Sequence, residues 1–571
     1  MENSEIADVF DRIADLLELQ DENEFRVRSY RNAARTVRDL SHRLEDMVSE
    51  GKKLSDLPNI GKSLEGKIKE IIKTGTSKRL KELEDQVPYG LVRIMQVGGL
   101  GPRKAMLLYR ELGVQSVDEL KKACENQEVR NLPGMGAKTE ENILKGIRTL
   151  ETYTGRMLYH TAAGFVSSLV RHLESVPEVK KYEVAGSFRR RKETVGDLDI
   201  LVQAKDRDRA LEKILSYKEI GEVQSRGSEK SSVVLKSGLQ VDFRFFDPEN
   251  FGAALCYFTG SKAHNISLRK RAQDKGWKLN EYGIFEKDKL LAGRTEEDLY
   301  KQLSLKWVPP ELREDRGEIE GAEGDRLPEL IKLSDIRGDL HCHTKATDGS
   351  DSIQDMVEAA RQKGYQYIGI TDHSKMVAVA RGLDDERLKK HADDIRKINA
   401  KYDDIRVLAG VEVDILKDGT LDISEEVLAE LDWVVASVHF YQDMDEKKMT
   451  DRVVKAVKSG VVHSLGHPLC RIIGSRDPIK VDMDKVFEAC KENRVILEIN
   501  AQPDRLDLPD TYCQQALSEG LSFQIATDAH MKADLDLMDL GVGMARRGWL
   551  SKKNVINTRT AKQMEKILKK K

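Results

Sequence analysis

The spacing of hydrophobic positions changes along the chain, from helical to strand-like and then to an alternation of the two. Near the N-terminus, apolar residues such as Ile6 and Val9 recur at the spacing of an amphipathic helix. Residues 239–246 alternate as in a half-buried strand. Beyond about residue 337, short apolar runs alternate with helical stretches such as residues 353–363. The pattern predicts a helical N-terminal part followed by mixed α+β and then α/β structure.

Three glycine-containing turns interrupt the helical part, beginning at Leu57, Val97 and Leu132. Each is an apolar residue, a short hairpin, a cation and a helical run, an arrangement that resembles the helix-hairpin-helix motif. Glycine lets the backbone come close to a phosphate, and the amides of the next helix N-terminus face its oxygen. One copy is equally consistent with a plain turn between helices, whereas three favour sequence-independent binding of a DNA backbone. The glycines expected at DNA are Gly61, Gly99, Gly101, Gly134 and Gly136.

A pair of aspartates, Asp197 and Asp199, precedes the apolar run that begins at Ile200. Residues i and i+2 of a strand share a face, so both carboxylates project together. Such a pair can bind two divalent cations for displacement at phosphorus, although an isolated pair is more often a solvated strand end. Asp242, on the alternating strand, could supply a third carboxylate from a neighbouring position.

A Gly-Ser turn at Gly186 and Ser187, followed by the cations of residues 189–192, stands ahead of the aspartates. Glycine amides and arginines suit a triphosphate. The residues therefore predict metal-dependent nucleotidyl transfer.

These segments, with residues 257–261, resemble the X family of DNA polymerases over about residues 1–315. The resemblance implies that Asp197, Asp199 and Asp242 carry two catalytic Mg²⁺ or Mn²⁺ ions, and that Arg269 contacts the template. Lys262 departs from the family, which has an aspartate near the incoming base. The nucleotide-binding residues that the resemblance implies are Gly186, Ser187, Arg190, Gly196, Tyr257, Phe258, Gly260, Ser261 and Asn265.

The same resemblance places Lys67 where the family has a lysine that forms a Schiff base with 5′-deoxyribose phosphate, and Tyr30 matches an accompanying tyrosine. Arg26 and Ser63 replace lysines of the family. Because a nucleophilic lysine needs a lowered pKa, which a sequence does not show, an ordinary helix lysine near DNA remains the alternative for Lys67.

Histidines are concentrated in the C-terminal part, where eight of the 12 lie beyond residue 340. Most stand with carboxylates at the ends of apolar, strand-like runs separated by helical stretches, which predicts a parallel barrel with its chemistry at that end. His391 and His463 fit no strand end. Imidazoles mixed with carboxylates suit zinc, manganese or iron, and such a site could bind about two or three ions and activate water towards phosphorus. The expected ligands are His341, His343, Asp348, His373, Glu412, His439, His467, Asp528 and His530.

Residues 337–571 resemble the PHP phosphoesterase domain, a distorted (β/α)7 barrel, and keep every ligand position. In polymerases of the bacterial and archaeal X family, this fused domain carries 3′-5′ exonuclease activity, often with cleavage at abasic sites. The resemblance thus implies a second active site that uses zinc or manganese.

At 571 residues the chain is expected to contain three or four domains. The expected fold is multidomain, α+β and α/β: a helix-hairpin-helix module, a nucleotidyltransferase palm with a thumb-like subdomain, and the barrel. The expected boundaries are 1–87 and 88–150 for two helical domains, 151–245 for the palm, 246–315 for the nucleotide-selecting subdomain, 316–336 for a polar linker and 337–571 for the barrel.

Composition adds little to the functional picture. A net charge of −3 with 34% charged residues does not indicate nucleic-acid binding. For such binding, however, local clusters of cations matter more than the net charge of the chain. Six cysteines without a CxxC pair argue against disulfides and zinc ribbons. With no membrane-length apolar run and an acidic N-terminus unlike a signal peptide, we expect a cytoplasmic chain and no membrane partner.

The sequence favours a DNA repair polymerase that fills short gaps and removes 3′ nucleotides. Its partners would be gapped or primer-template DNA and deoxynucleoside triphosphates, and we expect a monomer. One alternative is a nucleotidyltransferase that adenylylates small molecules or RNA, which the hairpins and residues 257–261 disfavour. Another is a DNA scaffold with structural metal sites, which would require closed sites rather than ligands at strand ends.

Overall fold

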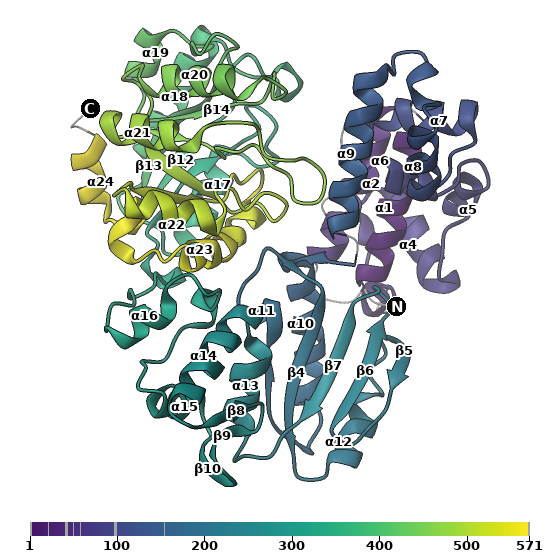
Figure 1. The fold of residues 1–571 in the computed structure, drawn as a ribbon. Helices are drawn as coiled ribbons and strands as arrows, with labels where there is room; N and C mark the ends of the chain where they lie inside the picture. The colour runs from purple at the N-terminus through teal and green to yellow at the C-terminus, as the bar shows by residue number, and fades with distance from the viewer. Residues whose placement is uncertain are drawn as a thin grey trace. The chain divides into compact units, whose positions relative to one another are not determined.

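The computed structural model describes the chain except residues 1–2, 21, 40–43, 50, 58, 96, 98–99, 154 and 569–571 (Figure 1). The chain forms two compact units, one of Met1–Thr154 with Gly474–Asp477 and the other of Gly155–Ile473 with Pro478–Lys571. Among the described residues, no helix has both the length and the apolar character needed to cross a bilayer.

The first unit is helical because its apolar residues form stripes at helical spacing. Ile6, Phe10 and Ile13 of the first helix are fully buried, as the sequence pattern predicts. A single core extends from Ile6 to Ile147, so the two predicted helical domains, 1–87 and 88–150, pack together rather than separately. The helices are α1 (Asn3–Leu19), α2 (Glu24–Asp39), α3 (Leu44–Ser49), α4 (Lys62–Thr74), α5 (Lys78–Glu84), α6 (Gly90–Met95), α7 (Pro102–Leu112), α8 (Val117–Glu125) and α9 (Ala137–Tyr153).

The palm of the second unit is a five-stranded sheet with the order β2-β4-β7-β6-β5. Its central strands β4 and β7 are parallel, and the other pairs are antiparallel. The strands are β2 (Val179–Val184), β4 (Asp197–Ala204), β5 (Ile220–Ser225), β6 (Lys230–Leu235) and β7 (Gln240–Phe245), with a small ribbon of β1 (Met157–Leu158) and β3 (Thr194–Val195). The helices are α10 (Tyr159–Glu174), α11 (Gly186–Arg189) and α12 (Arg207–Ile214).

A smaller α/β subdomain follows the palm, as predicted. A buried Glu296 carboxylate joins it to the palm, since Arg189 and Arg313 both donate to it, at 2.8 and 2.6 Å. Its elements are α13 (Phe251–Thr259), α14 (Lys262–Asp274), β8 (Lys278–Asn280), β9 (Gly283–Glu286), β10 (Lys289–Ala292), α15 (Glu296–Gln302) and η3 (Pro310–Leu312).

Residues 316–336 differ from the free linker that their polar composition predicts. They contain helix α16 (Glu318–Glu323) and the single turn η4 (Leu333–Asp335). Glu318 at the start of α16 is fully buried, where its carboxylate lies 2.6 Å from His264 Nδ1 and accepts hydrogen bonds from the amides of Asp315 and Arg316. Glu318 therefore serves packing rather than solvation.

The C-terminal part is a seven-stranded parallel sheet in sequence order, β11 to β17, whose first and last strands are in contact. This arrangement confirms the predicted (β/α)7 barrel and fold class. The strands are β11 (Gly338–Cys342), β12 (Tyr367–Ile370), β13 (Arg406–Asp414), β14 (Trp433–Ser437), β15 (Ser464–Leu465), β16 (Ile496–Asn500) and β17 (Phe523–Ala526). The helices are α17 (Ile353–Gln362), α18 (Asp385–Asn399), α19 (Glu425–Ala429), α20 (Glu446–Val457), α21 (Met483–Asn493), α22 (Asp510–Ser518), α23 (Met538–Arg547) and α24 (Ala561–Leu568).

Candidate functional sites

Three carboxylates gather on the two parallel strands in the middle of the palm. The β4–β7 register sets Asp199 directly beside Asp242, and Asp197 lies two residues earlier on β4. Leu198, between the two aspartates of β4, is fully buried, while Asp197 is exposed. Because strand side chains alternate between faces, Asp197 and Asp199 share the face opposite Leu198.

Two cations neutralise this carboxylate group. Arg244 Nε lies 3.0 Å from Asp199 Oδ1, and its Nη2 lies 2.9 Å from Asp242 Oδ2. Lys230 Nζ, from β6, lies 2.8 Å from the same Asp242 oxygen. A divalent ion bound here would have to displace these two side chains from the carboxylates.

The two buried carboxyls have pKa values shifted in opposite directions. Burial raises the pKa of Asp199; Arg244 acts against this shift, and the charges of Asp197 and Asp242 reinforce it. Burial also favours neutral Asp242, but hydrogen bonds from Lys230 and Ser232 bring its pKa below the ordinary value. Asp242 is therefore the carboxylate that its surroundings keep ionised.

The Gly-Ser turn packs directly against these aspartates. Gly186 has a φ of +67°, which favours glycine, and a Cβ added there would lie 3.4 Å from Asp199 Oδ2. The Ala185 amide donates to the Asp199 carbonyl at 2.8 Å. Ser187, the second residue of α11, directly follows this contact with Asp199. Gly196 is also confined, because an added Cβ would lie 3.0 Å from Arg156 Nη1.

The predicted nucleotide-pocket residues lie on α13, α14 and the turn between them. Asn265 donates from Nδ2 to the Tyr257 carbonyl at 2.7 Å, and Arg269 donates from Nε to the Asn265 carbonyl at 3.3 Å. These three residues line one pocket, together with Asn280 of β8. The structure thus brings together the residues for which nucleotide and minor-groove contacts are predicted.

The C-terminal end of α13 and the turn that follows it lie between this pocket and the carboxylates. The Phe258 ring centroid lies 4.2 Å from Arg244 Cζ, the guanidinium that pairs with Asp199 and Asp242. Gly260 has a φ of +66°, and Ser261 caps α14 by accepting a hydrogen bond from the His264 amide at 3.3 Å.

The three hairpins of the first unit share several features in their described residues. Gly61 and Gly101 are the N-cap residues of α4 and α7, and Gly136 immediately precedes α9. A Cβ added at any of these glycines would meet nothing within 4 Å, so each helix N-terminus is open to a ligand. Gly134 has a φ of +74°, and Gly99 lies outside the described residues. In each hairpin one amide closes the turn three residues back: Ile60 to Leu57 at 3.2 Å, Leu100 to Val97 at 3.0 Å and Met135 to Leu132 at 3.0 Å.

Lys67 lies on α4 beside two of the residues singled out with it. Its Nζ donates to Ser63 Oγ at 3.2 Å and lies 5.9 Å from the centroid of the Tyr30 ring. The structure thus brings Lys67, Ser63 and Tyr30 together.

The barrel gathers the predicted ligands of six strands at one end. Eight of the nine fall in three overlapping clusters, each compact enough to surround an ion. The ninth, His467, has Nε2 3.0 Å from Glu412 Oε1. The clusters are His343, Asp348, His373 and His530; His341, His343 and Asp528; and His373, Glu412 and His439.

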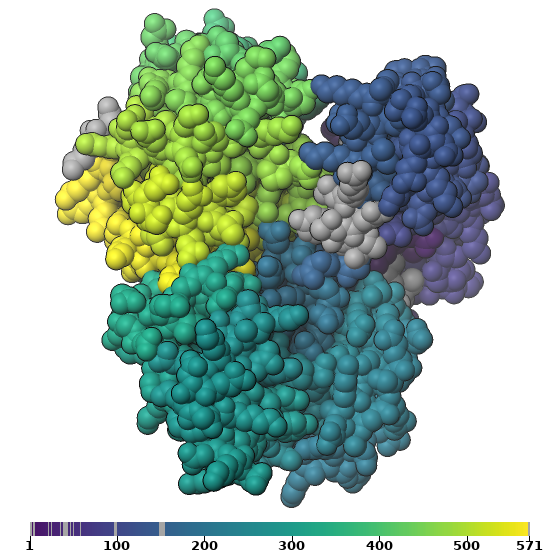
Figure 2. Space-filling model, viewed as in Figure 1, coloured from purple at the N-terminus to yellow at the C-terminus, as the bar shows by residue number. Residues whose placement is uncertain are grey.

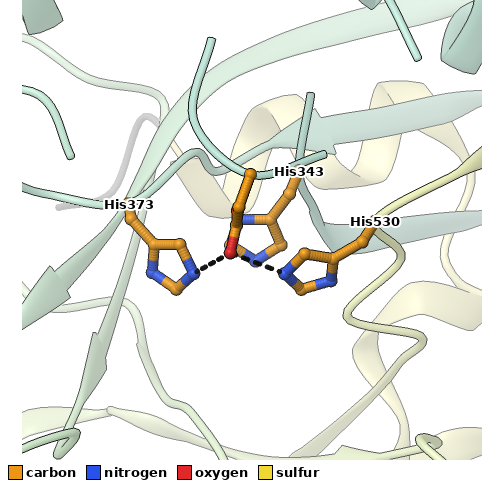
Figure 3. Close-up of side chains that lie close together, drawn as sticks. His343, His373 and His530 are labelled. Atoms are coloured by element: carbon orange, nitrogen blue, oxygen red, sulfur yellow. Dashed lines mark ion pairs between the residues drawn. The ribbon is translucent and has the colours of Figure 1, made fainter. Parts of the chain in front are cut away.

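The first cluster shows how far-apart segments converge. The rings of His343, His373 and His530 point towards one another in Figure 3, after strands β11, β12 and β17. The dashed lines join His373 Nε2 and His530 Nε2 to Asp348 Oδ2, and both distances are 3.4 Å. His343 also belongs to the second cluster and His373 to the third, so the three clusters form one continuous centre.

The unused nitrogens of this centre fit metal ligation. His341 Nε2, His343 Nδ1 and His467 Nδ1 are buried and make no hydrogen bond with the described part of the chain. Buried polar atoms of this kind are normally satisfied, and neutral imidazole with carboxylate is the donor set of zinc, manganese or iron. The residues present therefore fit a multi-ion centre.

Outer hydrogen bonds orient the imidazoles. His341 Nδ1 lies 2.8 Å from Glu498 Oε2, and His439 Nδ1 lies 3.0 Å from Asp414 Oδ2. His530 Nδ1 lies 2.8 Å from the Asp528 carbonyl. In each case Nδ1 is engaged, and Nε2 is left to face the centre, as in metal-ligating histidines.

The charges within the centre shift its histidines in both directions. Burial lowers the pKa of His343 to about 4, helped by the charges of His530 and His373. Burial opposes the protonation of His439 as well, but Glu412 raises its pKa to about 9. His530 likewise has a pKa of about 9, since Asp348 outweighs its burial. Metal binding would displace these protons.

Several supporting residues escaped the sequence reasoning. Glu498 lies within the apolar strand β16, and Asp414 lies two residues beyond Glu412 on β13. Asp372 accepts a hydrogen bond from the Thr344 amide at 2.8 Å and lies 2.8 Å from His391 Nε2. His391 thus supports the centre from outside the clusters. Their positions in the sequence could have indicated them. Asp414 lies on a ligand-bearing strand, Asp372 lies just after one, and Glu498 lies on the strand between two of them.

Known families match successive parts of the chain. A helix-hairpin-helix domain matches residues 1–77, a SAM-like helix-hairpin-helix tandem 92–149, the DNA polymerase beta palm 160–245, the DNA polymerase beta thumb 254–314 and the PHP domain 339–502. The order of the matches follows the order of the structural parts.

Relatives match either the whole chain or its barrel. The DNA polymerase/3′-5′ exonuclease PolX of Bacillus subtilis strain 168 is 39% identical over 577 residues, with 100% of both chains covered. A probable phosphatase of Thermoanaerobacter sp. strain X514 is 27% identical over 245 residues, 41% of this chain and 95% of that protein. The probable phosphatase YcdX of Shigella flexneri is 30% identical over 166 residues, 28% of this chain and 63% of that protein. The palm, thumb, hairpins and barrel, matched from end to end, place this chain in the X family of DNA polymerases, among the members with a C-terminal PHP domain.

Proposed function

We propose that this chain is a DNA-directed DNA polymerase that works in the palm and a 3′-5′ exonuclease that works in the barrel. The observation that carries the proposal is that two separate groups of potential metal ligands come together, three aspartates on β4 and β7 and nine histidines and carboxylates at the end of the barrel. The name of the full-length Bacillus relative contains both activities.

In the palm, Asp197, Asp199 and Asp242 would hold Mg²⁺ or Mn²⁺. When bound, such ions stabilise the charge that develops at phosphorus during transfer. Arg244 and Lys230 would turn away from the carboxylates as nucleotide and ions enter. Asp242, kept ionised by its surroundings, would accept the proton of the primer 3′-hydroxyl.

The nucleotide would lie between the Gly-Ser turn and α14. Gly186, Ser187, Arg190 and Gly196 would bind its phosphates through amides, hydroxyl and guanidinium. On the other side, Tyr257, Phe258, Gly260, Ser261 and Asn265 would line the sugar and base, and Arg269 would reach the template. The proximity of Gly186 to Asp199 supports this arrangement.

In the barrel, His341, His343, Asp348, His373, Glu412, His439, His467, Asp528 and His530 would hold about two or three zinc or manganese ions. Bound ions of this kind supply an activated water for attack on phosphorus. Asp414 and Glu498 orient the ligand histidines His439 and His341.

The substrates we propose are gapped or primer-template DNA and deoxynucleoside triphosphates, in short-gap DNA repair. The three open helix N-termini would bind phosphates without reading bases, so affinity for DNA should fall steeply with salt. Lyase activity at Lys67 and cleavage at abasic sites are further activities to be tested. We propose a monomer in the cytoplasm, for which six buried free cysteines are suited.

A paired assay tests the division of labour. Template-directed extension and 3′ degradation are measured on a one-nucleotide gap with Asp197→Ala and His341→Ala separately. We expect Asp197→Ala to lose only extension and His341→Ala to lose only degradation. Intact extension in Asp197→Ala would refute the polymerase site, and loss of both activities in both variants would refute two independent sites.

A further inference from the structure

Within the second unit, one face of the barrel packs on the palm at Arg191, on the end of the thumb at Glu311 and on the segment that follows the thumb. In Figures 1 and 2 the yellow α22–α23 region adjoins the teal region that contains α16. Helix α23 supplies much of this contact: Asp539 Oδ2 lies 2.9 Å from Arg191 Nη2, and Arg546 Nε lies 2.7 Å from Glu311 Oε1. A Cβ added to Gly543 would lie 2.9 Å from Arg191 Cδ, so the approach is close.

Arg547, at the end of α23, reaches the predicted triphosphate arginine itself. Its Nη1 donates to the Arg190 carbonyl at 2.7 Å and to Glu314 Oε1 at 3.0 Å. Its Nη2 donates to Asp510 Oδ2 of α22 at 2.5 Å. The Arg547 side chain is only 2% exposed, so these contacts are shielded from water. Arg547 of the barrel therefore binds both the backbone carbonyl of Arg190 and the carboxylate of Glu314.

Glu314 connects the two arginines. The same oxygen, Oε1, accepts from Arg190 Nε at 3.0 Å and from Arg547 Nη1 at 3.0 Å. Arg190 Nη1 donates to the Thr259 carbonyl, next to Gly260 of the predicted nucleotide pocket. Neither contact of Arg190 uses Nη2. The guanidinium is thus fixed by two of its nitrogens.

The buried charge of Glu314 and those of Arg190 and Arg547 stabilise one another. Burial lowers the pKa of Arg190, and Glu314 opposes that effect. Burial disfavours the Glu314 carboxylate, but Arg547 and Arg190 bring its pKa below the ordinary range. If Arg547 were removed, Glu314 would lose a cation and the Arg190 carbonyl would lose a donor. Arg190 would then be less constrained.

We propose that Arg547 of the barrel is a positioning residue for the polymerase site, because it fixes Arg190 through Glu314 and the Arg190 carbonyl. This inference rests on the proposed function, in which Arg190 contacts the triphosphate. Arg547 touches neither nucleotide nor ions; it sets the geometry of a side chain that does. The barrel then contributes to nucleotide binding as well as to its own chemistry.

The test compares Arg547→Met with Arg546→Met in the full-length chain. Arg546 precedes Arg547 on the same helix and makes an ion pair across the same interface, but it contacts Glu311 and the Ile331 carbonyl rather than Arg190 or Glu314. Single-nucleotide gap filling gives kcat and KM for the nucleotide. Because misplacement of a positioning group weakens binding, we expect Arg547→Met to raise KM about tenfold with little change in kcat. Arg546→Met should leave KM unchanged.

Degradation of the 3′ end by the barrel reports on folding in both variants and should be unchanged. If Arg547→Met does not yield folded protein, Arg547→Lys retains the charge without the two-nitrogen contact and should raise KM less. An Arg190→Met, Arg547→Met double variant should be no worse than Arg190→Met alone, which a general loosening of the interface would not produce.

The outcomes separate this inference from the proposed function. If Arg190→Met raises KM and Arg547→Met does not, or if Arg546→Met raises it equally, the positioning role is overturned while the polymerase assignment stands. An unchanged KM in Arg190→Met would remove both the nucleotide contact and the role of Arg547. A wild-type chain that does not extend a primer would overturn both the inference and the proposed polymerase activity.

Discussion

The palm and barrel sites are both built from side chains that could ligate metals, but their supporting contacts are opposite in kind. In the palm, Arg244 and Lys230 pair with Asp199 and Asp242, so cations of the chain occupy the carboxylates. In the barrel, ligand histidines are held by outer acceptors such as Glu498, and buried nitrogens make no hydrogen bond. We infer that the barrel is preorganised for ions and that the palm has to exchange its own cations for them.

The largest effect is expected from removing a charge at the heart of the barrel. Glu412 belongs to one ligand cluster and lies 3.0 Å from His467 Nε2. Glu412→Gln should reduce 3′ degradation about a thousandfold, the scale of losing one preorganised electrostatic group, while extension persists. Exposed Glu426 of α19 offers the control Glu426→Gln. Degradation at the wild-type rate in Glu412→Gln would show that the barrel centre is not the nuclease.

A second variant tests preorganisation itself. Glu498 touches His341 rather than a metal position, so Glu498→Gln keeps the ligands but weakens the orientation of His341. Loss of an outer partner typically costs about 10–100-fold in metal affinity or activity, and we expect degradation to fall within that range. Restoration by excess Mn²⁺ would support weakened metal binding as the cause. Glu488→Gln, exposed on α21, is the matched control, and an equal loss there would count against preorganisation.

The pH dependence of stability in a Glu296 variant tests the contact between palm and thumb. Burial disfavours its carboxylate, but Arg313 and Arg189 lower its pKa far below the ordinary 4.5. A lowered carboxyl pKa contributes stability that is complete above the ordinary value and is lost as pH falls through the folded pKa. Glu296→Gln should therefore lower the free energy of unfolding by about 3–5 kcal/mol at neutral pH.

This difference should shrink as pH falls below 4.5 towards the folded pKa of Glu296. Chemical denaturation at several pH values measures it, with the exposed neighbour Glu297→Gln as control. A difference that stayed constant with pH would mean that the ion pairs of Glu296 are not its source.

The smallest effect concerns the exchange of cations in the palm. Arg244 is 21% exposed and pairs with both Asp199 and Asp242. Arg244→Met should lower the Mg²⁺ concentration for half-maximal extension about fivefold, equivalent to about 1 kcal/mol for a partly exposed pair. Arg226→Met, exposed in the same sheet region, is the control. An unchanged Mg²⁺ requirement would show that Arg244 does not compete with ions.

The sequence predicted most of what lies at strand ends and less of what acts across space. His439 and Asp528 could be found because each follows an apolar run, and the register of Asp199 with Asp242 required only two strands to pair in parallel. Glu498 stood inside an apolar strand, where it resembles a stray polar residue. Glu314 and Arg547 are 233 positions apart, so no local pattern links them.

The segment 316–336 shows a different limit. Its composition is that of a linker, yet Glu318 is buried. The partner that offsets the cost of burying its carboxylate is His264, 54 residues away in the sequence. Composition records polarity but not pairing. The same limit hid Arg244, whose position two residues after Asp242 marks the shared strand face but not the ion pair that it forms.

The central claim is that the barrel binds ions on a prepared set of ligands and the palm does not. Metal content after purification and dialysis, measured on the wild-type chain, His343→Ala and Asp242→Ala, tests it most directly. We predict that wild-type and Asp242→Ala chains retain the same number of tightly bound zinc or manganese ions and that His343→Ala loses them. Ions retained by His343→Ala, or lost from Asp242→Ala, would contradict the account.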